Sequence, residues 1–313
     1  MRVGPRAKTP HYLQQPENRL MSRWIIGLGV TATLVLFASV VSWAGSDGGI
    51  VVEGIPLFVW CAASVYLFQW LIFIHAWLSQ TELFFDLIGG ITFVALMLAA
   101  LWFSGAADPR SVLIALVIII WALRLAPFLY SRTKNAGEDQ RFRKIKTSFP
   151  TWLMVWTIQG SWVFITASCA LAAVTSSIKV PVGSLFILGF LMWVGGFAIE
   201  VVSDRQKSRF KSEPDNSGRF IQSGLWSWSR HPNYFGEIVL WLGVAVMSYP
   251  VLQGWQSLTL ISPIYVMVLL TWVSGARILE ARADKTWGDD LDYQIYKRNT
   301  PSMILWPPKD NPG

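Results

Sequence analysis

Polar side chains crowd into nine residues between Ser229 and Glu237, which read Ser-Arg-His-Pro-Asn-Tyr-Phe-Gly-Glu. The run predicts the start of a helix, because serine is a preferred cap and proline fits the first turn. A helix start presents free backbone N–H groups and the positive end of the helix dipole, so Arg230 and His231 would favour an anion such as a phosphate. Asn233 and Glu237 are four residues apart and share one face. The competing interpretation is an ordinary capped helix at a membrane interface.

A second group of charges lies just before this run, where an apolar segment ends at Ser203 and Asp204. Four cations follow at every second position: Arg205, Lys207, Arg209 and Lys211. On a helix the first and third of these cations share one face, and the second and fourth share the adjacent face. Such a helix end is typical of a cytosolic anchor, and it is also suited to hold phosphates.

A few ionisable residues fall within or at the ends of apolar segments, where a charge at the bilayer centre costs about 3 kcal/mol. Arg124 is far from any predicted interface, and it is either functional or half of a buried ion pair that ties two helices together. Glu82 and Asp86 open an apolar segment, where the helix dipole favours carboxylates. If Glu82 instead faces an apolar pocket, its protonated carboxyl could donate a hydrogen bond to a carbonyl oxygen.

Several other kinds of site have no support in the sequence. The chain has no HExxH and no CxxC motif, and its three histidines are far apart, so no metal site is expected. Cys61 and Cys169 both lie in apolar stretches and read as buried thiols. The Gly27-Leu28-Gly29 stretch lies inside an apolar segment, without the glycine spacing of a soluble dinucleotide-binding fold. The basic residues are split among short segments, which argues against binding of nucleic acid.

The elements that must position these residues are membrane helices. Of 313 residues 53% are hydrophobic and 14% are charged, and the mean hydropathy is +0.43. Eight apolar segments approach the roughly 20 residues that span a bilayer as a helix. They are Trp24–Trp43, Pro56–Leu78, Phe84–Trp102, Ser111–Tyr130, Trp152–Val174, Val182–Val202, Ile238–Tyr249 and Trp255–Val273. The predicted fold class is therefore all-α, a polytopic membrane helix bundle.

Charge placement gives an orientation, because Lys and Arg accumulate in cytoplasmic segments. With the amino terminus inside, the inside segments carry 23 of the 26 basic residues. The predicted organisation is a basic leader (1–23), an extra membrane helix and loop (24–50), a bundle (51–274) with cytosolic loops at 131–151 and 204–234, and a tail (275–313). The first apolar segment is longer than a usual signal-peptide core, so we expect it to be retained. The aromatic tail is expected to fold back and close the underside of the bundle.

These motifs together resemble a known family of membrane reductases. The order is a Ser-Asp basic helix end, an R-x-x-Q-x-G-L turn from Arg219, an N-x-x-G-E helix start at Asn233 and a tyrosine-rich basic tail. This order resembles the steroid 5-alpha-reductase family. The R-H-P-N-Y-F-G-E form and the W-G-D-D tail resemble more closely its bacterial branch, the DUF1295 type. The similarity extends over about residues 80 to 308.

The resemblance implies a seven-helix core that holds NADPH and reduces a carbon–carbon double bond conjugated to a ketone, most directly in a 3-oxo-delta-4-steroid. It implies that Glu82 binds the substrate ketone, with Trp121 and Arg124 as further catalytic residues. Trp121 stands where steroid reductases usually have tyrosine. The implied cofactor-binding residues are Gln159, Asp204, Arg205, Arg209, Lys211, Arg219, His231, Asn233, Tyr234, Glu237, Tyr296 and Arg298.

The sequence leaves one competing class of function and disfavours another. The R-H-P-x-Y-x-G run and the acidic, tyrosine-rich tail also resemble isoprenylcysteine carboxyl methyltransferases, which use S-adenosylmethionine. A transporter is disfavoured, because the sequence lacks paired interrupted helices in two matching halves. We expect a monomer in the bacterial inner membrane with both termini in the cytoplasm, and a hydrophobic substrate that enters from the bilayer between the third and fourth spans.

Overall fold

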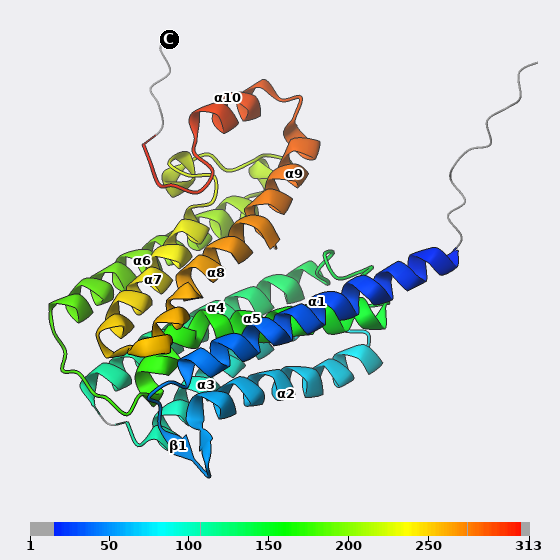
Figure 1. Ribbon diagram of the computed structural model, residues 1–313. Coiled ribbons are helices and arrows are strands. Elements are labelled where there is room, and N and C mark those ends of the chain that lie inside the picture. Colours follow the sequence, from blue (N-terminus) through cyan, green and yellow to red (C-terminus); the bar gives the residue numbers. More distant parts are fainter. Residues whose placement is uncertain (1–15, 107, 274, 308–313) are drawn as a thin grey trace, which may run out of the picture.

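The computed structural model describes residues 16–106, 108–273 and 275–307, with side chains described from residue 21 onward. Most of the predicted basic leader and the last residues of the tail lie outside this part of the chain. The helices are α1 (Pro16–Gly45), α2 (Leu57–Leu78), α3 (Phe85–Ser104), α4 (Pro109–Ala136), α5 (Phe149–Thr175), α6 (Ser184–Ser212), α7 (Pro232–Ser248), α8 (Ser262–Val268), α9 (Ala276–Trp287) and α10 (Leu291–Asn299) (Figure 1).

Short elements join these helices. Four 3₁₀ turns are η1 (Pro214–Asn216), η2 (Gly224–Ser227), η3 (Tyr249–Val251) and η4 (Gly254–Ile261), and η5 (Leu269–Val273) is a π-helical turn. β1 (Val51–Val52) and β2 (Ile55–Pro56) form a small antiparallel hairpin. Eight helical segments in the described part are long and apolar enough to cross a membrane. The predicted all-α membrane bundle is confirmed.

Two of the predicted spans differ from the observed helices. The seventh apolar segment was predicted to begin at Ile238, and α7 extends it back to Pro232, which confirms that the run from Ser229 to Glu237 starts a helix. The eighth was expected to be one continuous helix. It consists of η4, α8 and η5 in succession, so 3₁₀ and π geometry flank a short α-helix.

The centre of the bundle is α5, which is buried along nearly its whole length. The additional amino-terminal helix α1 packs against α5, where a Cβ on Gly27 would lie 2.6 Å from the Pro150 carbonyl oxygen. At its other end Trp43 packs on Trp255, with ring centroids 5.2 Å apart. The first span is therefore an integral part of the helix packing.

Helices α6 and α7 pack backbone against backbone through two pairs of glycines. A Cβ on Gly196 would lie 2.5 Å from the carbonyl oxygen of Gly236, and one on Gly189 would lie 2.5 Å from that of Gly243. Small residues allow such close approach between membrane helices. Because Glu200 is one turn beyond Gly196 and Glu237 follows Gly236, this contact sets the geometry of the polar residues described next.

The two ends of the bundle differ in character. Helices α9 and α10 gather with the 213–231 segment at one end, and the β hairpin lies at the opposite end (Figure 1). The carboxyl end of α6 and the start of α7 face the first of these ends. The basic and acidic residues singled out in the sequence therefore lie near the folded tail.

Candidate cofactor and substrate site

Arg124 on α4 forms a fork with two carboxylates of α6. Its Nη1 donates to Glu200 Oε1 at 2.6 Å, and its Nη2 donates to Asp204 Oδ2 at 2.6 Å. Both carboxylates are buried, and Arg124 is only partly exposed. The planar guanidinium presents its N–H donors in a fixed fork, which suits two carboxylates one helical turn apart. The buried ion pair considered for Arg124 is present, and it joins α4 to α6.

Trp121 lies one turn before Arg124 and reaches the same cluster. Its indole Nε1 donates to Glu200 Oε2 at 3.1 Å. The fully buried ring packs edge to face on Trp241, at 5.0 Å between centroids, and on Phe93, at 5.2 Å. These aromatic contacts hold the indole in one orientation. Trp121 therefore connects the aromatic core of the bundle with the charged cluster.

Helix α7 adds an amide and a third carboxylate. Asn233 Nδ2 donates to Asp204 Oδ1 at 3.2 Å. Glu237, one turn later on the same face, is buried, and its charge interacts with those of Glu200, Asp204 and Arg124. The structure thus brings together Trp121, Arg124, Asp204, Asn233 and Glu237 of the predicted site. We call this group, with Glu200, the acid cluster.

Glu82 lies elsewhere, in the turn before α3. Its Oε2 accepts from Lys146 Nζ at 2.5 Å, and its Oε1 accepts from the backbone N–H of Asp139 at 3.2 Å. Both carboxylate oxygens are thus bonded to the loop that joins α4 to α5. In the same loop Asp139 pairs with Arg141 at 2.5 Å. Burial alone would raise the pKa of Asp139, but the hydrogen bonds and the charge of Arg141 outweigh it and lower that pKa.

Gln159 also lies apart from the acid cluster, within a buried amide network. Its Nε2 donates to the Phe85 carbonyl oxygen at 2.8 Å and to Gln69 Oε1 at 3.2 Å. Gln69 in turn donates to Thr92 at 2.8 Å. The network links α2, α3 and α5, and through Phe85 it fixes the first turn of α3.

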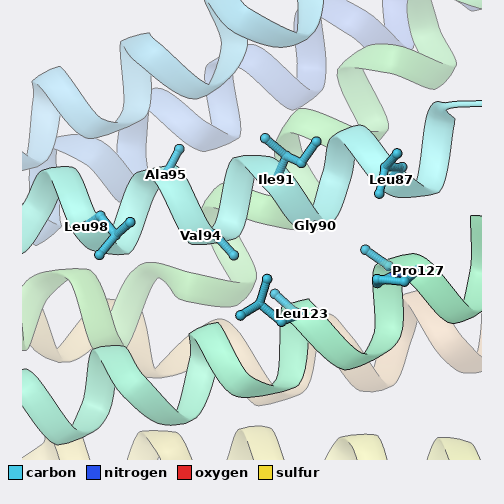
Figure 2. Close-up of a pocket in the computed structure, with 10 residues that line it drawn as sticks. Leu87, Gly90, Ile91, Val94, Ala95, Leu98, Leu123 and Pro127 are labelled. Atoms are coloured by element: carbon cyan, nitrogen blue, oxygen red, sulfur yellow. The ribbon is translucent and has the colours of Figure 1, made fainter.

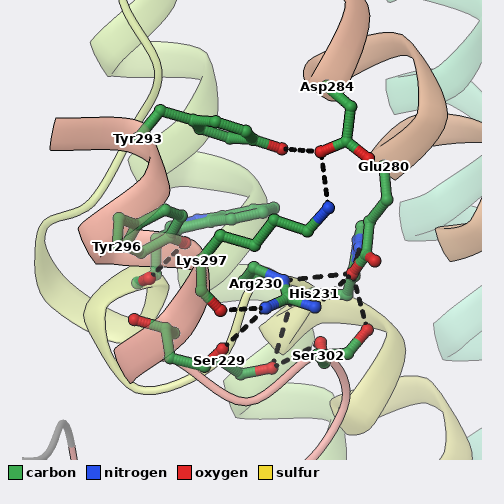
Figure 3. Close-up of polar contacts among 11 residues, drawn as sticks. Ser229, Arg230, His231, Glu280, Asp284, Tyr293, Tyr296, Lys297 and Ser302 are labelled. Atoms are coloured by element: carbon green, nitrogen blue, oxygen red, sulfur yellow. Dashed lines mark hydrogen bonds and ion pairs between the residues drawn. The ribbon is translucent and has the colours of Figure 1, made fainter. Parts of the chain in front are cut away.

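The tail is fastened to the start of α7 through Glu280 of α9 (Figure 3). Glu280 Oε1 is 3.0 Å from Arg230 Nη2, 3.2 Å from His231 Nε2 and 2.7 Å from Ser302 Oγ. Arg230 Nη1 also donates to the carbonyl oxygens of Lys297 and Thr300, at 2.6 and 2.9 Å. The anion expected beside Arg230 and His231 is therefore a carboxylate of the chain itself. We call Arg230, His231, Glu280 and Ser302 the tail clamp.

The residue at the cap position of α7 also differs from the expectation. His231, not Ser229, precedes the first turn, and Ser229 Oγ accepts from the His231 N–H at 3.2 Å. The His231 ring stacks on Tyr234 at 5.4 Å between centroids. Burial lowers the pKa of His231, and the hydrogen bond and charge of Glu280 offset only part of that effect.

Aromatic residues complete the contact between the tail and the 213–231 segment. Tyr296 donates from its hydroxyl to the Trp226 carbonyl oxygen at 2.7 Å, and Trp287 Nε1 donates to the Gly218 carbonyl oxygen at 2.6 Å. The Phe220 ring lies among Trp287, Tyr293 and Tyr296. The Tyr296 hydroxyl is thus engaged in holding α10 against η2.

The predicted basic residues are exposed at this end of the molecule. Arg209 pairs with Glu213 at 3.5 Å. Four other cations form no ion pair with any residue that the structure describes: Arg205, Lys211, Arg219 and Arg298. Lys207 instead lies over the Trp226 ring, with its Nζ 4.2 Å from the centroid. The end of α6, the 213–231 segment and α10 therefore present exposed cations that form no ion pair within the described residues.

An apolar groove opens between α3 and α4 (Figure 2). It has a volume of about 260 Å³, and its walls are Leu87, Gly90, Ile91, Val94, Ala95, Leu98, Ala122, Leu123, Ala126 and Pro127. A second, smaller space of about 10 Å³ adjoins it and shares Gly90, Ala122 and Ala126 as lining. Trp121, which donates a hydrogen bond to Glu200, lines this inner space. The groove therefore leads towards the acid cluster.

Sequence reasoning left out Glu200, Lys146 and Glu280 as site residues. Glu200 had a usable signal, because it stands four residues before Asp204 and so shares its helix face. Lys146 lies 64 residues from Glu82, and Glu280 lies 49 residues from His231 and 22 from Ser302. No local spacing could have paired them.

Comparisons with known proteins add a family and several relatives. Residues 71–300 match the family described as "Protein of unknown function (DUF1295)". An uncharacterized protein of Schizosaccharomyces pombe is 23% identical over 163 residues, which are 44% of this chain and 47% of that protein. Steroid 5-alpha-reductase DET2 of Arabidopsis thaliana is 40% identical over 65 residues, 20% of this chain and 24% of the relative.

A third relative is 3-oxo-5-alpha-steroid 4-dehydrogenase 1 of Homo sapiens, 35% identical over 69 residues, which are 22% of this chain and 26% of the enzyme. This chain spans less than half the length of each of these relatives. No solved structure matches the chain. The family match covers residues 71–300, well over half of the chain, and the protein therefore belongs to the DUF1295 family and is steroid 5-alpha-reductase-like.

Proposed function

We propose that this protein is an NADPH-dependent reductase of a carbon–carbon double bond conjugated to a ketone in a hydrophobic molecule, most directly a 3-oxo-delta-4-steroid. One observation carries the proposal. Trp121 lines the inner end of a groove between membrane helices and also bonds Glu200 of the acid cluster. A site for a lipid and a site for a polar cofactor would therefore meet at one residue. The names of the steroid reductase relatives support the same chemistry.

The side chains at the cofactor end have the chemistry that NADPH requires. Arg205, Lys211, Arg219 and Arg298 are exposed and form no ion pair within the described residues, so they are free to neutralise phosphates. Asp204, Asn233 and Glu237 supply carboxylate and amide groups that suit ribose hydroxyls and a carboxamide. We propose these as the residues that hold the cofactor, with Arg209 and Tyr234 at the edge of the same surface.

The tail clamp, in this proposal, shapes the cofactor site from outside. His231 forms a hydrogen bond with Glu280, and it would orient the start of α7. Tyr296 donates a hydrogen bond to the Trp226 carbonyl oxygen, and it would orient the 213–231 segment. Gln159 would act in a similar way, because its bond to the Phe85 carbonyl oxygen fixes the start of α3. The resemblance implies that His231, Tyr296 and Gln159 bind the cofactor directly; we propose that they instead position the segments around it.

Bound NADPH would supply the hydride that the β-carbon of the enone gains, and a proton from water at the α-carbon would complete the saturated ketone. The chain has to orient the substrate, exclude water and stabilise negative charge at the ketone oxygen. Of the residues predicted to be catalytic, Trp121 lines the space next to the groove, whereas Arg124 and Glu82 would act as positioning residues. Arg124 holds Glu200 and Asp204 in place, and Glu200 fixes the Trp121 indole. Glu82 would act through Lys146, which it holds beside the start of α3.

The two molecules would reach the site from different phases. We propose that the lipid enters from the bilayer through the groove between α3 and α4, and that NADPH enters from the cytosol between α6, α7 and the tail. The concentration of basic residues at this end favours an orientation with both termini in the cytoplasm. For a chain of this type we propose the bacterial inner membrane, and a monomer as the active form.

The test is a reduction assay with the full chain in lipid nanodiscs. We expect loss of NADPH absorbance that depends on added 3-oxo-delta-4-steroid, with a saturated ketone as the product. An Asp204→Asn, Asn233→Leu double variant should lose NADPH binding. Binding of S-adenosylmethionine in place of NADPH would overturn the proposal and indicate a methyltransferase.

A further inference from the structure

Two large apolar side chains near the end of the tail are not buried by the fold. Ile304 and Trp306 are 63% and 65% exposed, on either side of the half-buried Leu305. Tyr293 of the same tail, by contrast, is buried and packs against Phe220. An exposed apolar cluster is unfavourable in water, so it marks a surface that contacts something else.

The backbone joins a third exposed side chain to this pair. The Trp306 N–H donates to the Trp228 carbonyl oxygen at 3.1 Å, and Trp228 is 42% exposed. Next to it, Ser229 Oγ donates to the Ser302 carbonyl oxygen at 3.2 Å. The end of the tail and the 213–231 segment therefore run side by side here. We call Trp228, Ile304 and Trp306 the tail patch.

The height of the tail patch along the bundle follows from the contacts between η2 and α6. Trp226 Nε1 donates to the Ser203 carbonyl oxygen at 3.0 Å, and the Leu225 N–H donates to Gln206 Oε1 at 3.0 Å. The turn η2 therefore lies beside α6 and not beyond its end. Trp228 follows η2 directly, so the tail patch lies at about the same height.

This stretch of α6 is where the sequence passes from the membrane to water. Val202 ends the apolar segment, and the charged residues Asp204 and Arg205 follow it closely. Exposed tryptophans mark the same boundary on two other spans, Trp24 near the start of α1 and Trp272 in η5. Tryptophan is enriched at membrane–water interfaces. The tail patch therefore lies at the height of the lipid headgroups.

Positive charge around the tail patch favours anionic lipid as its neighbour. Lys207 lies over the ring of Trp226, with its Nζ 4.2 Å from the centroid, two residues before Trp228. Arg219 and Arg298, in the two segments that form the patch, are exposed and form no ion pair within the described residues. A second copy of this chain would bring the same cations face to face, whereas anionic headgroups attract lysine and arginine.

We propose that the tail patch docks on the membrane, with Trp228, Ile304 and Trp306 inserted among the lipid headgroups at this end of the bundle. The patch continues the lipid-contacting surface of the spanning helices, so the bilayer already lies beside it. Indole rings suit this depth, because the ring is apolar and its N–H can bond to headgroups or water. Together with the tail clamp, the docking fastens the tail on two sides, to α7 and to the membrane. It goes beyond the proposed function and does not depend on it.

Spin labelling of the full chain tests the docking. Cys61 and Cys169 are buried, so Trp306→Cys supplies one accessible thiol for a nitroxide. The labelled chain is placed in nanodiscs of phosphatidylcholine and phosphatidylglycerol, and collisions of the nitroxide with oxygen and with a water-soluble nickel chelate are measured. We expect more collisions with oxygen, which concentrates in lipid, and several-fold fewer with nickel, than for a label at Asp289→Cys. Asp289 is the matched control, because it is exposed between α9 and α10.

Ile304→Cys is a second labelling position, expected to give the same result, and it covers the case in which Trp306→Cys does not fold. Nickel collisions at these positions equal to those at Asp289→Cys would show that the patch lies in water and would overturn the proposal. A label shielded from both oxygen and nickel would also overturn it, because protein would then cover the patch. In that case dipolar broadening between labels would identify a second copy as the cover. The measurement needs no NADPH and no steroid, so its outcome is separate from that of the reductase assay.

Discussion

Gly196 on α6 and Gly236 on α7 face each other so closely that a Cβ on either one would lie 2.5 to 2.6 Å from the carbonyl oxygen of the other. The contact places Glu200 and Glu237 on adjoining helix surfaces, next to Arg124. The acid cluster therefore depends on two residues that have no polar side chain.

Gly196→Ala is expected to destabilise the protein by about 1 to 3 kcal/mol, because the added methyl group would force α6 and α7 apart. The affinity for NADPH should also fall, because Asp204 lies on α6 and Asn233 lies on α7, and separating the two helices would move these side chains apart. Thermal unfolding in detergent and NADPH titration measure the two effects. Gly195→Ala is the matched control, because a Cβ on Gly195 would meet nothing within 4 Å. Equal unfolding temperatures for the two variants would contradict the packing described for α6 and α7.

Removing Arg124 should destabilise the protein strongly. Arg124→Gln would leave Glu200 and Asp204 buried without a cation, and breaking a buried ion pair in this way costs about 3 to 5 kcal/mol. Adding Glu200→Gln to the first change should recover part of the loss, because one uncompensated charge is then removed. The double-mutant cycle is measured by thermal unfolding. Additive effects would show that Arg124 and Glu200 do not stabilise each other.

The sequence was sufficient to predict the membrane bundle, because the apolar segments are long and the bilayer fixes their length. Helical spacing also predicted that Asn233 and Glu237 share one face, and the family resemblance implied that Asp204 belongs with them. The sequence could not predict the partners of Glu82 and His231. Lys146 and Glu280 reach these residues through the arrangement of the whole chain, which no local pattern encodes.

The tail clamp should make the folded protein less stable at acidic pH. Because burial lowers the pKa of His231 in the folded protein, the unfolded chain binds more protons than the folded one below the ordinary pKa of about 6.5. The free energy of unfolding should therefore decrease as the pH falls through and below that value. His231→Gln should reduce this decrease, as measured by thermal unfolding between about pH 5 and pH 8. Identical pH profiles for variant and wild type would rule out His231 as the source.

The unpaired cations should distinguish NADPH from NADH. Lys211→Gln is expected to weaken NADPH binding by about tenfold, in the range of one charge-assisted hydrogen bond. The effect on NADH should be smaller, if Lys211 contacts the additional phosphate of NADPH. Lys285→Gln removes an exposed cation from α9, so it controls for the general loss of positive charge. The same weakening in both variants would indicate nonspecific attraction.

In this proposal the acid cluster and the exposed cations bind a phosphorylated nicotinamide cofactor. The most direct test is a titration of the full chain in nanodiscs with NADPH, followed by energy transfer from tryptophan to the bound nicotinamide. We expect saturable binding that is lost in the Asp204→Asn, Asn233→Leu variant and is not displaced by S-adenosylmethionine. No binding of NADPH, or its displacement by S-adenosylmethionine, would contradict the account.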